Sequence, residues 1–211
     1  MVSYDELKKA RKTSGEILAE QKAHNPYGEE LSDLIGTPLL EGYKTNPDDD
    51  EVIARLKIAS HVMAQGGNST LKPLLPMLLS IRGKPYHLHD HFVFSPFFRT
   101  RMPRSTLLKT GRQVSKSTSL ASQGVLFSNC IPYFSTLYIT PLFEMIRRFS
   151  QNYVAPFIET SPVGNLFSGQ STVNNVLQRS FKNRSQMIFS FAYLDAERTR
   201  GISADKNVID E

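Results

Sequence analysis

The sequence TGRQVSKST, residues 110–118, is the part of this chain that decides its fold class. It follows an apolar, β-like run and opens a helix-compatible segment. This layout is typical of a phosphate-binding loop, whose backbone N–H groups surround phosphate oxygens at a helix N-terminus. Lys116 would place its ammonium near the β- and γ-phosphates, and Ser117 would ligate a magnesium ion. The predicted nucleotide-binding residues are Thr110, Gly111, Arg112, Gln113, Val114, Ser115, Lys116, Ser117 and Thr118.

The loop departs from the usual pattern G-x-x-x-x-G-K-[ST] at both glycines. Thr110 and Ser115 stand at those positions, and only Lys116 and Ser117 match. A residue other than glycine at position 115 meets a steric cost if the backbone there needs a positive φ. On the loop alone, a solvated basic turn before a helix is an equally good interpretation.

Length and composition are those of an ordinary globular protein. The 211 residues suffice for one or two domains with a buried core, and the single cysteine, Cys130, excludes an intramolecular disulfide. No apolar run approaches the ~18 residues of a membrane span, and the N-terminus lacks the apolar core of a signal peptide. These features favour a cytoplasmic protein without a membrane partner.

Charge is unevenly distributed along the chain. Residues 1–72 contain 9 Lys/Arg and 12 Asp/Glu, a net charge of −3, and residues 73–211 contain 16 and 8, a net charge of +8. The basic part carries the candidate phosphate loop. Such a surface favours a polyanionic partner such as nucleic acid, although arginines that serve nucleotide binding or solubility would give the same balance.

The first 85 residues are expected to form a helical N-terminal region. Helix formers predict a helix over residues 4–22, and an acidic first turn predicts another over residues 49–64. Residues 71–79 are apolar but contain two prolines, which predicts a short or kinked helix.

Residues 86–211 alternate strand-like and helical patterns, which indicates an α/β fold with a mostly parallel sheet flanked by helices. Ala121 and Gly124 in the helix after the loop would allow close packing. The expected elements are a strand over 105–109, a helix over 117–129, a strand over 134–140, a helix over 142–158, a hairpin of 176–181 and 187–192, and a strand beginning at Asn207.

A second motif lies at the end of this last strand, where the sequence reads VIDE over residues 208–211. In phosphate-loop NTPases a strand-end acid holds the magnesium ion, directly or through water. Asp210 would take that role, and Glu211 would act as general base toward the attacking water. An ordinary strand followed by a charged turn is the plainer interpretation, but the order of the two motifs favours the functional one.

Four segments taken together resemble the ATPase domain of the large subunit of viral, tailed-phage terminase, the DNA-packaging motor. They are LKTGRQVSKST, FSTLYITP, NVLQRSFKNRSQMIFSFA and RTRGISADKNVIDE, the last with an Arg-Gly step before its acidic strand. The family's phosphate loop is a variant one, with an arginine four residues before the lysine, as at Arg112. The resemblance covers residues 86–211.

The resemblance implies a Mg-ATP site and assigns its residues. Arg112, Lys116 and Glu211 would be catalytic, with the arginine offsetting charge on the γ-phosphate, and Ser117 and Asp210 would bind magnesium. The implied partners are double-stranded DNA, the portal protein and the small terminase subunit, around a homo-oligomeric ring in the host cytoplasm. Candidate contacts to DNA or a neighbouring subunit are Arg147, Arg148, Arg179, Lys182 and Arg184.

The family also has a lid region and a C-terminal nuclease domain, which this sequence does not reach. We therefore expect a fragment with weak or absent ATP turnover. Two other functions stay open: a non-hydrolysing interaction module with a vestigial loop, and another phosphate-loop nucleic-acid motor such as a helicase.

The segment YHLHDHFVFSPFF, residues 86–98, invites two further interpretations. Its aromatic residues could stack on adenine, although most are expected to lie in the core. Its histidines and acid could share a metal ion, although a polar loop is the favoured interpretation. The residues concerned are His87, His89, Asp90 and His91.

Overall fold

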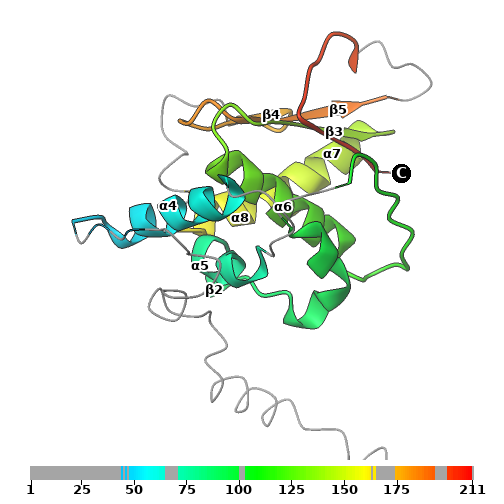
Figure 1. Ribbon diagram of the computed structural model, residues 1–211. Coiled ribbons are helices and arrows are strands. Elements are labelled where there is room, and N and C mark those ends of the chain that lie inside the picture. The colour runs from blue at the N-terminus through cyan, green and yellow to red at the C-terminus, as the bar shows by residue number, and fades with distance from the viewer. Residues whose placement is uncertain are drawn as a thin grey trace, which may run out of the picture.

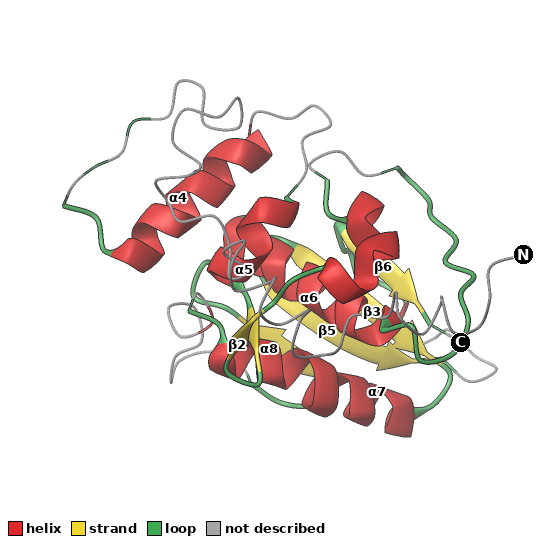
Figure 2. Cartoon of the chain, turned by 90° about the horizontal axis from the view of Figure 1, so that it is seen from below, coloured by secondary structure: helices red, strands yellow, loops and turns green. Residues whose placement is uncertain are grey.

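A β-sheet with helices packed against one of its faces organises the part of the chain that the structure describes (Figure 1). The computed structural model describes residues 44, 46, 48–64, 71–99, 103–162, 164, 174–192 and 199–210. The predicted helix over residues 4–22 lies outside this set. The helices α6 (Lys116–Cys130), α7 (Phe143–Phe149) and α8 (Ala155–Thr160) lie on the same side of the strands, as Figure 2 also shows.

The strand order of this sheet is β4-β5-β3-β6. Its central strands are β3 (Ser135–Thr140) and β5 (Gln186–Phe191), which are parallel, and β6 (Lys206–Ile209) runs parallel to β3 on the other side. The short edge strand β4 (Gln178–Ser180) pairs antiparallel with β5. The predicted hairpin, the predicted strand before residue 210 and the α/β class with a mostly parallel sheet are therefore confirmed.

Side chains alternate across the sheet, and one set faces the helices. Tyr138 of β3 belongs to this set, because its ring stacks on Phe149 of α7. Val208 of β6 is aligned with Tyr138. Since side chains two residues apart share a face, Lys206 and Asp210 lie on the same side as Val208. This alternation directs both charged side chains toward α6.

The helix after the loop packs closely against the sheet. α6 is buried from Ala121 through Cys130, and Gly124 lies against the side chain of Met187 in β5. The predicted helix over 142–158 is observed as α7 and α8 joined by a π-helical turn, η4 (Ser150–Val154). Pro156 explains the irregular turn, because it has no backbone N–H to donate to the preceding turn.

The elements before residue 86 share the same hydrophobic core. α4 (Glu51–Ala64) and α5 (Leu75–Leu78) contribute fully buried side chains that cluster with those of α6, and a 3₁₀ turn, η2 (Lys72–Leu74), precedes α5. The predicted helix over 49–64 and the short helix within 71–79 are therefore confirmed. A two-stranded hairpin follows, formed by β1 (Ser80–Ile81) and β2 (Lys84–Pro85).

The predicted strand over residues 105–109 is wrong. These residues belong to no helix or strand, and the side chain of Leu107 is 91% exposed. In the described sheet, β3 already has β5 and β6 as neighbours, so this segment does not pair with the central strand. An apolar run without a partner strand gains neither ladder hydrogen bonds nor burial.

Candidate functional site

The loop before α6 ends in two residues with left-handed backbone conformations. Gln113 has φ 61°, and Ser115, the N-cap of α6, has φ 62° and ψ 27°. The first described hydrogen bond of the helix runs from the N–H of Ser119 to the carbonyl of Ser115. Neither a capping side chain nor an acid is found in the first turn of this described helix. Its N–H groups and partial positive charge are therefore suited to an anion.

Lys116 and Asp210, distant in the sequence, meet at this helix start. Nζ of Lys116 lies 2.8 Å from Oδ1 of Asp210, with the two side chains 34% and 12% exposed. The lysine side of this pair is open to solvent and the acid side is largely buried. The ammonium can therefore turn from Asp210 to an incoming anion, as a lysine that binds phosphate must.

The second oxygen of Asp210 is held by a residue that the sequence motifs do not single out. The hydroxyl of Tyr138, in the central strand, donates a hydrogen bond of 2.7 Å to Oδ2 of Asp210. Burial, together with this hydrogen bond, raises the pKa of Tyr138, so the phenol stays protonated and acts as the donor. Only the strand pairing could have indicated this contact. Tyr138 pairs with Val208, and Asp210, two residues after Val208, lies on the same face of the sheet.

A second contact ties β6 to α6. Lys206 donates from Nζ to Oε1 of Gln123, and the amide nitrogen of Gln123 donates to the carbonyl of Phe97. The ammonium also lies 5.4 Å from the ring centroid of Phe127. Burial lowers the pKa of Lys206 to about 7. Lys206 and Asp210 thus fasten both ends of β6 to the same helix.

The residues present fit a magnesium ion that is accompanied by a nucleotide. Magnesium binds oxygen ligands and usually takes one or two from the protein, with phosphates and water filling the rest. Asp210 offers a carboxylate, and Ser117 offers a hydroxyl in the first turn of α6. Within the described part of the chain, no group of three or more His, Cys, Asp or Glu could hold a metal ion unaided.

The remaining predicted loop residues are exposed around this pair. Thr110, Gly111, Arg112 and Gln113 lie at the surface before α6, whereas Val114 and Thr118 are half-buried. The guanidinium of Arg112 is therefore free to approach a ligand from solvent. Glu211, the predicted general base, lies outside the described residues.

The aromatic segment upstream of the loop is largely core. Tyr86, Phe94 and Phe98 are 4%, 2% and 0% exposed, which removes them as stacking partners for adenine. His87 precedes η3 (His89–Phe97), which contains the other three residues of the predicted metal motif. The structure brings no metal-binding cluster together among the residues it describes.

The basic residues predicted to contact DNA or a neighbouring subunit differ in their burial and in their partners. Arg179 is half-buried and donates to Oγ of Ser150 at 3.2 Å, and burial lowers its pKa. Arg147 pairs with Glu144 at 2.9 Å on the exposed side of α7. The remaining exposed candidates are Arg148, Lys182 and Arg184.

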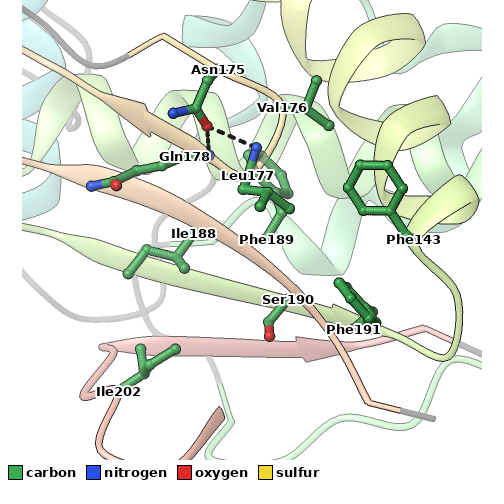
Figure 3. Close-up of a pocket in the computed structure, with 10 residues that line it drawn as sticks. All are labelled: Phe143, Asn175, Val176, Leu177, Gln178, Ile188, Phe189, Ser190, Phe191 and Ile202. Atoms are coloured by element: carbon green, nitrogen blue, oxygen red, sulfur yellow. Dashed lines mark hydrogen bonds between the residues drawn. The ribbon is translucent and has the colours of Figure 1, made fainter. Parts of the chain in front are cut away.

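A pocket of about 800 Å³ lies beside β4 and β5 (Figure 3). Its lining includes Phe143, Phe191 and Leu177, and Asn175 closes a turn by accepting from the N–H groups of Leu177 and Gln178. None of its lining residues belongs to the phosphate loop or to the Lys116–Asp210 pair. The Lys116–Asp210 pair is the stronger candidate site, because it brings two charged side chains to a helix N-terminus, whereas the pocket is lined mainly by apolar side chains.

Comparison of the chain with protein-family models, curated proteins and solved structures finds no match. Of the helices that the structure describes, none has the length and apolar character needed to cross a membrane.

Proposed function

We propose that this chain binds Mg-ATP at the N-terminus of α6, in the manner of phosphate-loop NTPases. The observation that carries the proposal is the 2.8 Å contact between Lys116 and Asp210 at the first residue of that helix. The lysine and the acid come from the two motifs that the sequence offered for phosphate and for magnesium. In this proposal ATP draws Lys116 to its phosphates, and Asp210 becomes available to the metal.

The left-handed conformation at Ser115 supports the same function. A positive φ immediately before the lysine turns the chain sharply into α6, as a glycine does at this position of the usual loop. The N–H groups of the first turn then point toward the space in front of the helix. A serine in this conformation performs the geometric role of the missing glycine at some cost in strain.

We further propose that the ATPase serves a terminase-type motor that moves double-stranded DNA into a procapsid. This step rests on the order of the motifs and not on the fold. Arg112 would offset charge on the γ-phosphate, and Glu211 would orient the attacking water. The portal protein, the small terminase subunit and further copies of the chain would be its partners.

The test is calorimetric titration of ATP with magnesium into the wild-type chain and the Lys116→Ala variant. We expect the variant to bind at least ~10-fold more weakly, because a charged hydrogen bond to phosphate contributes about 1.5–3 kcal/mol. Lys182→Ala removes an exposed lysine from the β4–β5 turn and should leave the affinity unchanged. Absence of ATP binding, or equal binding by Lys116→Ala, would contradict the proposal and favour a non-hydrolysing interaction module.

A further inference from the structure

The carboxylate of Asp210 has a different partner on each oxygen. Oδ1 lies 2.8 Å from Nζ of Lys116, and Oδ2 accepts the hydroxyl hydrogen of Tyr138 at 2.7 Å. One partner is a flexible lysine at the edge of solvent, and the other is a tyrosine that is only 3% exposed. The two oxygens therefore differ in how easily they can change partner.

The tyrosine is fixed by aromatic rings. Its ring lies parallel to that of Phe149, with centroids 3.8 Å apart and an interplanar angle of 3°. The ring of Phe189 meets it edge-on at 6.2 Å, and Phe149 stacks in turn on Tyr153 at 6.1 Å. Rings packed on more than one side cannot swing out, so the hydroxyl is a donor at a fixed point.

The lysine has no comparable restraint. Its side chain is 34% exposed, and Lys116 stands at the first residue of α6, beside unbonded N–H groups. An incoming phosphate would compete with Asp210 for the ammonium. The bond to Oδ1 can thus break while the bond to Oδ2 persists.

We propose that Tyr138 is the positioning residue of the magnesium site, holding Oδ2 of Asp210 so that Oδ1 alone exchanges Lys116 for the metal when Mg-ATP binds. The inference rests on the proposed function and adds a residue to that site. Hydrogen bonds from an outer residue orient a ligating carboxylate, and their loss typically weakens metal binding about 10–100-fold.

Without the hydroxyl, the carboxylate would be free to rotate about its Cβ–Cγ bond. Neither of its oxygens would then be held at the point where magnesium needs a ligand. The loss should therefore be seen in the contribution of the metal to binding, and not in the affinity for ATP alone.

The experiment compares ATP affinity with magnesium and with EDTA, and takes the ratio of the two dissociation constants. For Tyr138→Phe we expect this ratio to fall about tenfold from the wild-type value, with the affinity in EDTA unchanged. Asp210→Asn, which removes the ligating carboxylate itself, should lower the ratio at least as far. Tyr153→Phe removes a hydroxyl from the same aromatic stack and should keep the wild-type ratio.

A second variant weakens the restraint on the tyrosine without removing its hydroxyl. Phe149→Leu keeps the hydroxyl of Tyr138 but removes its stacking partner, and we expect a partial fall of the ratio. If a folded Tyr138→Phe protein keeps the wild-type ratio, the positioning role is wrong although the ATP site stands. If the wild-type chain binds no ATP in either condition, the proposed function fails, and this inference with it.

Discussion

The terminal methyl carbon of Met187 lies 2.7 Å from the point that a β-carbon on Gly124 would occupy. Gly124 stands in the buried part of α6, and Met187 in the parallel strand β5. The glycine thus sets how closely the helix approaches the sheet. Because α6 also begins with Lys116, this approach determines where the lysine stands relative to the strand ends.

Enlarging residue 124 should push the helix away from the sheet. For Gly124→Val we expect a loss of about 1–3 kcal/mol in the free energy of unfolding, the usual cost of overpacking. Gly124→Ala should be nearly neutral, since the methionine end is flexible and alanine favours the helix by about 1 kcal/mol. Urea denaturation followed by circular dichroism measures both. Adding Met187→Ala should recover part of the valine's cost, and a valine variant as stable as wild type would contradict the close contact.

The backbone strain at Ser115 of the phosphate loop should lower the free energy of unfolding by a measurable amount. Ser115 has φ 62°, which costs an L-residue about 1–2 kcal/mol, and glycine avoids this cost. Glycine also gains freedom in the unfolded chain, which offsets part of the benefit. We therefore expect Ser115→Gly to raise the free energy of unfolding by about 0.5–1 kcal/mol, measured by thermal and urea denaturation.

The matched control for this variant is Thr118→Gly, three residues later in the same helix turn. Residue 118 is helical, so a glycine there should lower the stability. ATP affinity of Ser115→Gly should equal or exceed that of wild type. Destabilisation by glycine at both positions would show that Ser115 is not strained.

Lys206 should make stability depend on pH in an alkaline range. Its pKa is lowered by burial to about 7 in the folded chain, against about 10.4 for an unperturbed lysine. Between these values the unfolded chain binds more protons, so the free energy of unfolding rises with pH. Lys206→Met lacks this group and should be the more stable protein at pH 6–7, with the difference shrinking as the pH approaches 10.

The measurement is the melting temperature of both proteins from pH 6 to pH 10. Lys182→Met, which changes an exposed lysine, should run parallel to wild type over the whole range. Parallel curves for wild type and Lys206→Met would mean that the charged form is fully compensated by Gln123 and the ring of Phe127.

The elements with strong local patterns were predictable from the sequence. β-branched and aromatic residues around Leu137 indicated the central strand, and the hairpin predicted from 176–181 and 187–192 is observed as the antiparallel pair β4 and β5. The elements that were missed depend on backbone conformation. The β1–β2 hairpin turns through Arg82 and Gly83, both with positive φ, and an arginine gives no signal for that conformation.

The candidate site was predictable where it consists of motif residues. Lys116 and Asp210 were named from the sequence, and the structure joins them. Tyr138 could not be found in this way, because its role follows from strand order and register, which the chain does not show locally. The strand expected at 105–109 failed for the same reason, since a strand requires a neighbour as well as a propensity.

Because side chains alternate along β6, the site depends on the register in which β6 pairs with β3. Thr136 is paired with Lys206 and Ile139 with Ile209, which puts Asp210 on the helix side. A slip of one residue would turn Asp210 to the opposite face and present Ile209 to Lys116. Such a misaligned sheet could keep most of its hydrogen bonds and still lose the acid. The contacts that Lys206 and Asp210 make with α6 therefore select one register of β6. A shift by one residue would leave a charged side chain without its partner.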